Sequence, residues 1–335
     1  MFYVLIFFVL SFVLTYLMRM YALKKNIIDN PNERSSHSIP TPRGGGVAVV
    51  VSFLLGLTLL IYLENLSLST GLILIAASFT IALLGFLDDH GHINALVRLA
   101  VHFIVAIGAV VALGGFSEIE LFNNTLQLGW AANIIAVLFL VWLLNLYNFM
   151  DGINGIASIE AITATVSIGS IYLLSSFHLS SQVLFLLAAC TAGFLLWNFP
   201  KARIFMGDAC SGFLGLVLGI LALIALKQDV ALFCAWLICL GVFIVDATFT
   251  LIRRVINGHK MYDAHRSHAY QYASRKYNSH TRVTLSVLAI NVLWLFPMAY
   301  FASQHVLMPE LLILIAYIPL VLLAMYFGAG KTENG

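Results

Sequence analysis

The chain has 335 residues, of which 61% are hydrophobic and 10% are charged. Soluble domains carry roughly 25% charged residues, so this composition leaves too little polar surface to coat a water-soluble globule. The abundance of apolar side chains also excludes a disordered chain. A net charge of +2 is too small to indicate nucleic-acid binding. The composition therefore indicates an integral membrane protein.

Eleven apolar stretches approach the length of about 20 residues that a transmembrane helix needs. In chain order they lie near 2–18, 44–63, 70–87, 99–114, 130–148, 156–176, 183–199, 209–226, 231–252, 284–303 and 310–328. The first stretch lacks the basic leader and small-residue cleavage site of a signal peptide, so we expect it to be retained. We predict an all-α integral membrane protein with about eleven transmembrane helices, forming a single polytopic domain over residues 1–335.

Lysine and arginine residues favour the cytoplasmic side of a membrane protein. With these spans, sixteen of the seventeen basic residues fall on one side, and Lys227 alone falls on the other. Seven of them lie in the long polar segment 253–283. We therefore predict that the N-terminus lies outside, that the C-terminus lies in the cytoplasm, and that 253–283 is a basic, histidine-containing cytoplasmic loop.

Acidic residues gather on the same predicted face, at the ends of three spans. Asp88 and Asp89 end one span in GFLDDH, Asp151 follows another in NLYNFMDGINGIA, and Asp208 begins a third in IFMGDACSG. A helix cap is the alternative for any one of them, and for Asp208 in particular. Two adjacent carboxylates, however, repel each other unless a cation or a proton lies between them. Oxygen ligands without a cysteine partner suit Mg²⁺ or Mn²⁺ rather than zinc.

Two further segments supply the complementary charge. SSHSIPTPRGGG, residues 35–46, contains Arg43 and three glycines, which allow the backbone to approach a ligand where a phosphate would meet a helix start. In the 253–283 loop, His265 and His268 are spaced to share one helical face, where they would bind phosphate, a uracil ring or a metal. Anchoring to anionic lipid is the alternative for Arg253 and Arg254.

Several other polar or small residues are interpreted as structural. His102, Glu160 and Asp246 lie within predicted spans, where a helix–helix hydrogen bond explains them as well as catalysis does. Gly215 and Gly219 form a GxxxG-like pair that is typical of helix packing. The four cysteines show no CxxC pattern, which predicts buried, reduced thiols.

Four motifs resemble those of a known family: LGFLDD, NLYNFMDGINGIA, PKARIFMGDACSGFLG and the histidine-containing loop. They resemble the polyprenyl-phosphate N-acetylhexosamine-1-phosphate transferases of the glycosyltransferase 4 type, a superfamily that includes phospho-N-acetylmuramoyl-pentapeptide transferase. The resemblance covers about residues 35–285, with the motifs in the same order. The AHRSHAYQ form resembles the branch that starts O-antigen or other surface polysaccharides.

The resemblance implies an enzyme of the bacterial inner (cytoplasmic) membrane, with its active site facing the cytoplasm and its surface in contact with lipid. Its partners would be a UDP-N-acetylhexosamine and undecaprenyl phosphate. The sugar 1-phosphate would be transferred, UMP released, and a lipid-linked surface polysaccharide begun. N-acetylfucosamine or N-acetylquinovosamine is the predicted sugar, with N-acetylglucosamine next. The sequence fits both a direct attack of the acceptor and a covalent enzyme intermediate. It also fits a homodimer. A transporter or flippase of a lipid-linked sugar is the alternative that the span count alone would suit.

The resemblance also implies roles for individual residues. Asp208, with Asp89, would bind Mg²⁺, or Mn²⁺ in its place. The catalytic residues would be Asp88, Asp89 and Asp151, with Asp88 deprotonating or positioning the acceptor phosphate. The substrate would be bound by Arg43, Asn148, His265, Arg266 and His268. Two positions depart from the family pattern: Asn154 stands where many relatives have Asp, and Cys210 stands where Gly or Thr is common.

Overall fold

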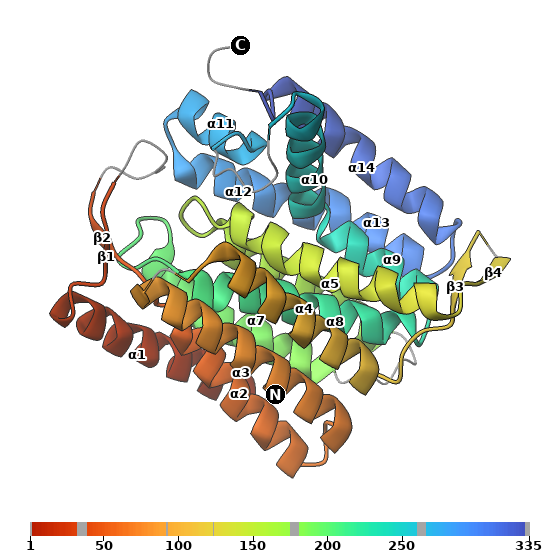
Figure 1. Cartoon of the computed structure of the whole chain (residues 1–335), viewed down its shortest axis with the longest axis horizontal. Coiled ribbons are helices and arrows are strands. Elements are labelled where there is room, and N and C mark those ends of the chain that lie inside the picture. Colours follow the sequence, from red (N-terminus) through yellow and green to blue (C-terminus); the bar gives the residue numbers. More distant parts are fainter. Residues whose placement is uncertain are drawn as a thin grey trace.

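The structure, a computed structural model, describes residues 2–31, 39–91, 93–122, 124–174, 181–259 and 266–331 and is almost entirely helical (Figure 1). Its helices are α1 (Phe2–Lys24), α2 (Val47–Tyr62), α3 (Leu68–Gly91), α4 (Ala95–Ala112), α5 (Trp130–Met150), α6 (Ile156–Leu174), α7 (Ser181–Asn198), α8 (Asp208–Leu226), α9 (Val230–Cys239), α10 (Gly241–Ile256), α11 (Ala269–Tyr277), α12 (His280–Ile290), the π-helical turn η1 (Asn291–Leu295), α13 (Phe296–Ser303) and α14 (Pro309–Tyr326). The predicted all-α fold is confirmed.

Nine of the described helices are long and apolar enough to cross a membrane, with α12, η1 and α13 counted as one continuous helix. The bent pair α9–α10 makes a tenth if it is a single span. The predicted stretch at 44–63 forms α2, which has only 16 residues. At 1.5 Å per residue it is about 24 Å long, which is shorter than the hydrocarbon core of about 30 Å.

Helix α8 lies at the centre of the bundle, and each of its residues from Ala209 to Ala225 is buried. It packs against α3 and α5. A Cβ at Gly215 would lie 2.5 Å from the carbonyl oxygen of Leu143 in α5, and one at Gly219 would lie 2.8 Å from Leu140 Cδ2. The predicted packing role of this glycine pair is therefore confirmed.

The predicted span 231–252 is two helices, because α9 and α10 meet at an angle of 73°. Helix α9 is wholly apolar, whereas α10 contains Asp246, Arg253 and Arg254. Charged side chains are costly in the bilayer interior, which favours the turn of α10 out of the common helix direction. Figure 1 shows α10 standing across the direction of the other long helices.

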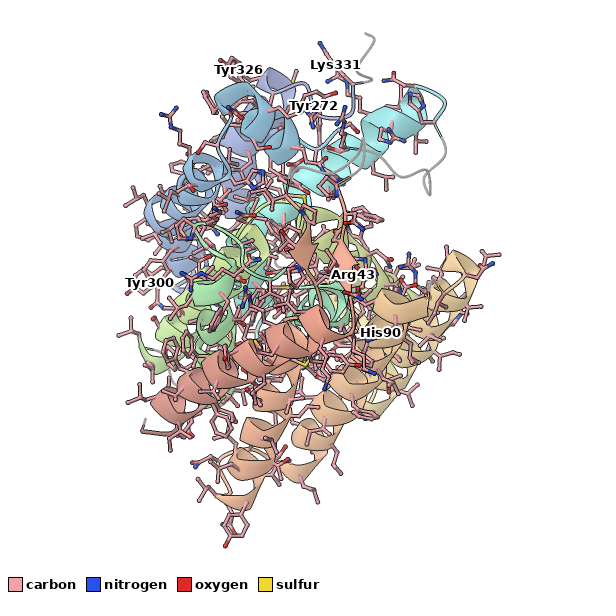
Figure 2. All side chains as sticks on the ribbon, turned by 90° about the vertical axis from the view of Figure 1, so that its left-hand side faces the viewer. Arg43, His90, Tyr272, Tyr300, Tyr326 and Lys331 are labelled. Atoms are coloured by element: carbon pink, nitrogen blue, oxygen red, sulfur yellow. The ribbon has the colours of Figure 1, made fainter. Side chains whose placement is uncertain are left out.

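Two short hairpins, which the all-α prediction did not include, lie at opposite ends of the bundle (Figure 1). Strands β1 (Ile28–Asp29) and β2 (Thr41–Pro42) pair at one end, and β3 (Glu118–Leu121) and β4 (Asn124–Gln127) pair at the other. We call the β1–β2 end, where α3 and α5 finish and α8 begins, the site end. Figure 2 looks onto it, with Arg43 near the centre and Tyr272, Tyr326 and Lys331 near the top.

Candidate active site

The two adjacent carboxylates lie in the last turns of α3 and meet different partners. Asp88 Oδ1 accepts a hydrogen bond of 2.6 Å from the backbone N–H of Ile93, which holds the turn between α3 and α4. Asp88 Oδ2 forms an ion pair with Arg98 of α4. Arg98 Nη1 also lies 3.2 Å from Asp208 Oδ2, at the start of α8. One guanidinium therefore joins carboxylates of α3 and α8.

Asp89 is held by Arg43 and by the N-terminus of α8. Arg43 Nη2 donates to the backbone carbonyl of Asp89 at 2.8 Å, and Arg43 Nε lies 3.5 Å from Asp89 Oδ1. The backbone N–H of Asp208 donates to the same Oδ1 at 3.4 Å. Asp89 Oδ2 is buried and has no hydrogen-bond partner among the described residues. That oxygen is the clearest available ligand atom in the cluster.

Glycines allow α3, α8 and the residue 44–46 segment to meet here. Gly207 has φ +81°, and a Cβ on it would lie 2.5 Å from Asp89 Oδ2. A Cβ on Gly85 would lie 2.5 Å from the backbone of Asp208 and Ala209. Any larger residue would push the carboxylates of α3 away from α8.

Gly45 and Gly46, which the sequence predicted to let the backbone approach a ligand, instead contact the protein's own backbone. Gly45 N–H donates to the carbonyl of Phe205, and Gly46 N–H to that of Met206, both at 2.9 Å. A Cβ on Gly46 would lie 2.1 Å from Cys210 Cβ. The expectation that these glycines approach a ligand is corrected for Gly45 and Gly46, whose small size serves packing around the start of α8.

Asn148 and Asp151 lie where α5 ends and the chain turns towards α6. Asn148 Oδ1 accepts a hydrogen bond of 2.8 Å from Ser211 Oγ in α8. Asp151 follows the last residue of α5. Burial raises the pKa of Asp151 well above its ordinary value, and the negative charges of Asp208 and Asp89 raise it further. A proton or a cation at this point would relieve the repulsion.

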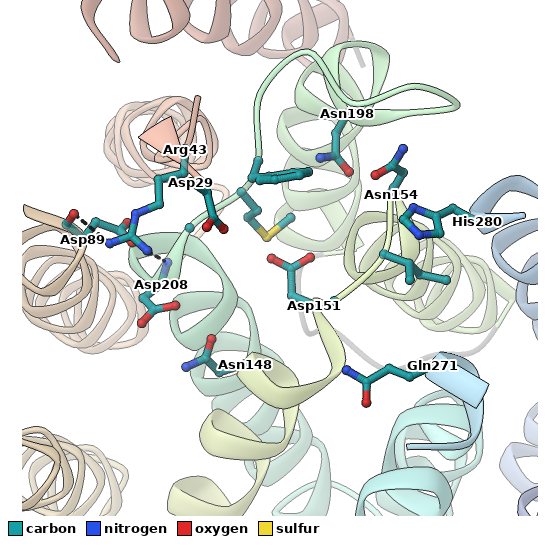
Figure 3. A pocket seen from close by; sticks show the side chains of 15 residues that line it. Asp29, Arg43, Asp89, Asn148, Asp151, Asn154, Asn198, Asp208, Gln271 and His280 are labelled. Atoms are coloured by element: carbon teal, nitrogen blue, oxygen red, sulfur yellow. Dashed lines mark hydrogen bonds and ion pairs between the residues drawn. The ribbon is translucent and has the colours of Figure 1, made fainter. Parts of the chain in front are cut away.

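These residues surround one cavity of about 230 Å³ at the site end (Figure 3). Five of the predicted site residues line it: Arg43, Asp89, Asn148, Asp151 and Asp208. The other side chains with polar groups on its wall are Asp29, Asn154, Asn198, Gln271 and His280. Figure 3 shows Asp89 and Asp208 on one side, which we call the acidic side, and Asn154, Asn198 and Gln271 across the cavity from them, which we call the amide side.

Asn198 ties together the two loops that form the amide side. Its side chain is buried, Oδ1 accepts from Gly155 N–H at 2.6 Å, and Nδ2 donates to the carbonyl of Ile204 at 3.0 Å. Asn154 Nδ2 donates to the carbonyl of Pro200 at 3.1 Å. An aspartate at position 154 could not make that bond when ionised, so the departure from the family pattern has a structural counterpart.

The histidine-containing segment meets the cavity differently from the prediction. His268 is the N-cap of α11 rather than a member of a helical face, and it is 3% exposed. Of the described predicted residues, Asp88, Arg266 and His268 do not line the cavity; Gln271 of the same segment does. His265 lies outside the described residues, so the predicted pair with His268 has no structural description.

Sequence reasoning did not select Arg98, Asn198 or Gln271. Arg98 had a signal, because it is the one basic residue between the spans at 70–87 and 99–114. Asn198 and Gln271 are uncharged amides whose importance depends on contacts with distant segments, and neither belongs to a spacing pattern that indicates chemistry.

The donor set fits Mg²⁺ with substrate and water as the remaining ligands. Among the described residues, no group of three or more His, Cys, Asp or Glu side chains is arranged to hold a metal by itself. Mg²⁺ is usually bound through one or two carboxylates together with waters and substrate phosphates. The buried, unpartnered Oδ2 of Asp89, next to Asp208 at the cavity wall, meets that requirement.

An apolar helix bundle with nine or ten described helices that could span a membrane, and with a carboxylate-lined cavity at one end, defines the class as a multi-pass membrane protein with a candidate enzyme site. The chain belongs to glycosyl transferase family 4, whose family model matches residues 71–226. This match covers the two aspartates at the end of α3, the α5–α6 turn and the whole of α8.

Named relatives agree with this assignment. The chain is 31% identical to a probable undecaprenyl-phosphate N-acetylglucosaminyl 1-phosphate transferase of Bacillus subtilis, over 77% of this chain and 72% of that protein. It is 26% identical to an undecaprenyl-phosphate alpha-N-acetylglucosaminyl 1-phosphate transferase of Thermotoga maritima, over 89% and 91%. A decaprenyl-phosphate N-acetylglucosaminephosphotransferase of Mycolicibacterium smegmatis is 28% identical, over 89% and 80%.

Proposed function

We propose that the protein transfers an N-acetylhexosamine 1-phosphate from a UDP-sugar to undecaprenyl phosphate, releasing UMP. The observation that carries this proposal is the cavity at the site end, where Asp89, Asp151 and Asp208 meet Arg43 and Asn148. A cavity at the end of an apolar bundle suits a reaction between a water-soluble diphosphate and a lipid with a charged head. The names of the relatives support the same reaction.

In this reaction an oxygen of the acceptor phosphate bonds to the β-phosphorus of the UDP-sugar. The bond from that phosphorus to the bridging oxygen breaks, and UMP carries the bridging oxygen away. We place the diphosphate against the acidic side, where a cation and the guanidinium of Arg43 would meet it. The sugar or the uracil would lie against the amide side, because amides donate and accept hydrogen bonds without carrying charge.

Asp208 and Asp89 would hold Mg²⁺, or Mn²⁺ in its place. A bound divalent cation supplies charge neutralisation to the transferring phosphoryl group, which is the main requirement of such reactions. Asp88, which Arg98 holds beside Asp208, would position the acceptor phosphate. Asn148 and Asp151 would contact the nucleotide and its cation. Arg266 and His268 would act through the placement of α11.

We further propose that the site end faces the cytoplasm of a bacterium, across its inner membrane. The basic residues support this orientation, since they favour the cytoplasmic side. The exception, Lys227, lies beside Phe116 at the β3–β4 end, with its Nζ 4.9 Å from the ring centre. A lipid-linked sugar made at this face would begin a surface polysaccharide such as an O-antigen.

Purified protein incubated with radiolabelled UDP-sugar, undecaprenyl phosphate and MgCl₂ should yield labelled lipid and an equal amount of UMP. Asp208→Asn should lower the rate by at least about a hundredfold, because several kcal/mol of charge stabilisation would be lost. Asp229→Asn is the matched control, since Asp229 caps α9 at the far end of the bundle. MgCl₂ should also raise the melting temperature of the wild type and of the control, but not that of Asp208→Asn.

No lipid product with any UDP-N-acetylhexosamine, or full activity in Asp208→Asn, would refute the proposal. Transport of a lipid-linked sugar into sealed liposomes without release of UMP would support the transporter alternative instead.

The donor sugar is a separate part of the proposal. The AHRSHAYQ resemblance favours N-acetylfucosamine or N-acetylquinovosamine, whereas the names of the relatives favour N-acetylglucosamine. A panel of the three UDP-sugars, scored by UMP release, decides between them. Turnover of UDP-N-acetylglucosamine alone would exclude the two 6-deoxy sugars.

A further inference from the structure

A buried carboxylate of α10 holds the helix that contributes Gln271 to the cavity wall. Asp246 is 5% exposed. Its Oδ1 accepts from Ala269 N–H at 2.8 Å, and its Oδ2 accepts from Tyr270 N–H at 3.0 Å. Thr250 Oγ1 donates to Oδ1 at 3.1 Å, and His268 Nδ1 lies 3.4 Å from the same atom. Each carboxylate oxygen therefore binds one of the first N–H groups of α11.

The first turn of α11 needs such a partner. The leading N–H groups of a helix have no acceptor within the helix, and the helix dipole favours a negative charge beside them. A side-chain hydrogen bond closes the same turn from within, because His268 N–H donates to Gln271 Oε1 at 3.2 Å. Asp246 is what ties this turn to α10.

The same turn also contacts the segment in which α5 ends and the chain turns towards α6. Tyr270 Oη donates to the carbonyl of Phe149, in the last turn of α5, at 3.0 Å. A Cβ on Gly152 would lie 2.2 Å from Tyr270 Oη, so the two segments are in tight contact just beyond Asp151. Burial raises the pKa of Tyr270 well above its ordinary value, so its hydroxyl remains protonated and continues to donate. Gln271, the next residue, lines the cavity.

We infer that Asp246 is a positioning residue, which places Gln271 at the amide side of the cavity and thereby sets the binding of the donor. It acts through α11 and does not itself line the cavity. The inference rests on the proposed function for the identity of the ligand, although the placement of α11 by Asp246 does not depend on it.

Asp246→Asn is the variant that tests the inference. The amide keeps the size of the side chain but turns one of the two acceptors towards Ala269 and Tyr270 into a donor. The KM for the UDP-sugar should rise about tenfold, which is the scale of effect when the partner that orients a binding group is lost. The KM for undecaprenyl phosphate should stay unchanged. In a Gln271→Ala background, Asp246→Asn should add little further change, because both substitutions act through one side chain.

Asp229→Asn is again the matched control, since Asp229 Oδ1 accepts from Ala231 N–H at 2.8 Å and so caps the N-terminus of α9. It should lower the melting temperature to a similar extent and leave both KM values unchanged. A lower melting temperature in Asp246→Asn with both KM values unchanged would show a purely structural role and overturn the inference. So would additive effects of Asp246→Asn and Gln271→Ala.

Hydrogen–deuterium exchange of the full-length protein in detergent tests the placement of α11 without turnover. Peptides covering 267–273 should exchange faster in Asp246→Asn than in the wild type or in Asp229→Asn. Unchanged exchange there would overturn the inference. If the protein transfers no sugar but 267–273 still exchanges faster in Asp246→Asn, the placement of α11 by Asp246 is supported and the proposed function is refuted.

Discussion

Gly85→Ala should separate the carboxylates of α3 from the start of α8. Gly85 lies one turn before Asp88 and Asp89, and residues three and four apart share a helix face. A Cβ on Gly85 would lie 2.5 Å from the backbone of Asp208 and Ala209, where ordinary contact begins at 3.4 Å. The obstruction is backbone, which cannot swing aside as a flexible side chain would.

The structure sets the size of the effect. Relieving the contact requires an opening of about 0.9 Å between α3 and α8, from 2.5 Å to 3.4 Å. Overpacking of this kind costs about 1–3 kcal/mol, of which the better helix propensity of alanine offsets about 1 kcal/mol. A displacement near 1 Å of catalytic groups lowers the rate by about a hundredfold. Activity should therefore fall far more than stability does.

The assay is UMP release by detergent-purified protein, alongside its melting temperature. Gly108→Ala provides the control, because Gly108 lies in α4 and a Cβ there would meet no atom within 4 Å. It should keep wild-type turnover and melt at the same temperature or slightly higher. A folded Gly85→Ala protein that turns over as fast as Gly108→Ala would refute the argument that the α3–α8 distance sets the rate.

Two other predictions concern the loops around the cavity. Asn198→Ala should destabilise the protein by about 1–3 kcal/mol through the loss of buried hydrogen bonds, and should also reduce turnover. Asn133→Ala, which removes an equivalent pair of side-chain hydrogen bonds at the far end, should lower only the melting temperature; equal turnover in the two variants would contradict the role given to Asn198. Truncation after Phe327 removes the 2.8 Å hydrogen bond from Gly330 N–H to the Ser267 carbonyl beside α11, so we expect faster proteolysis near 267 and slower UMP release. Unchanged values of both would count against a supporting role for this segment.

The parts of the site that the sequence predicted are those that depend on chain order alone. Hydropathy locates the spans, and alternate crossings bring the ends of the spans near 70–87 and 130–148 to the same face as the start of the one near 209–226. Asp88, Asp89, Asp151 and Asp208 had to gather at one end once those spans were placed. The structure brings three of these four to one cavity and holds the fourth to Asp208 through Arg98.

The remaining features of the site and the fold depend on the residue at which a helix begins and on contacts between distant segments. A local sequence pattern contains neither. Whether His268 or Gln271 faces the cavity depends on the residue at which α11 begins. The first N–H of α11, that of Ala269, is bound by Asp246, which lies 23 residues earlier in the chain. The break between α9 and α10 likewise depends on the charged residues later in α10. The average hydropathy of the whole stretch does not contain this information and predicts one span.

The charge of the cavity bears on how a diphosphate could enter it. Four aspartates line it, namely Asp29, Asp89, Asp151 and Asp208, whereas Arg43 is the one arginine or lysine among its described lining residues. Arg98 is engaged by Asp88 and Asp208. A bare diphosphate would meet more acidic than basic side chains on the cavity wall. The proposed donor therefore fits this site as a complex with its divalent cation, because the cation joins two sets of negative charge that would otherwise exclude each other.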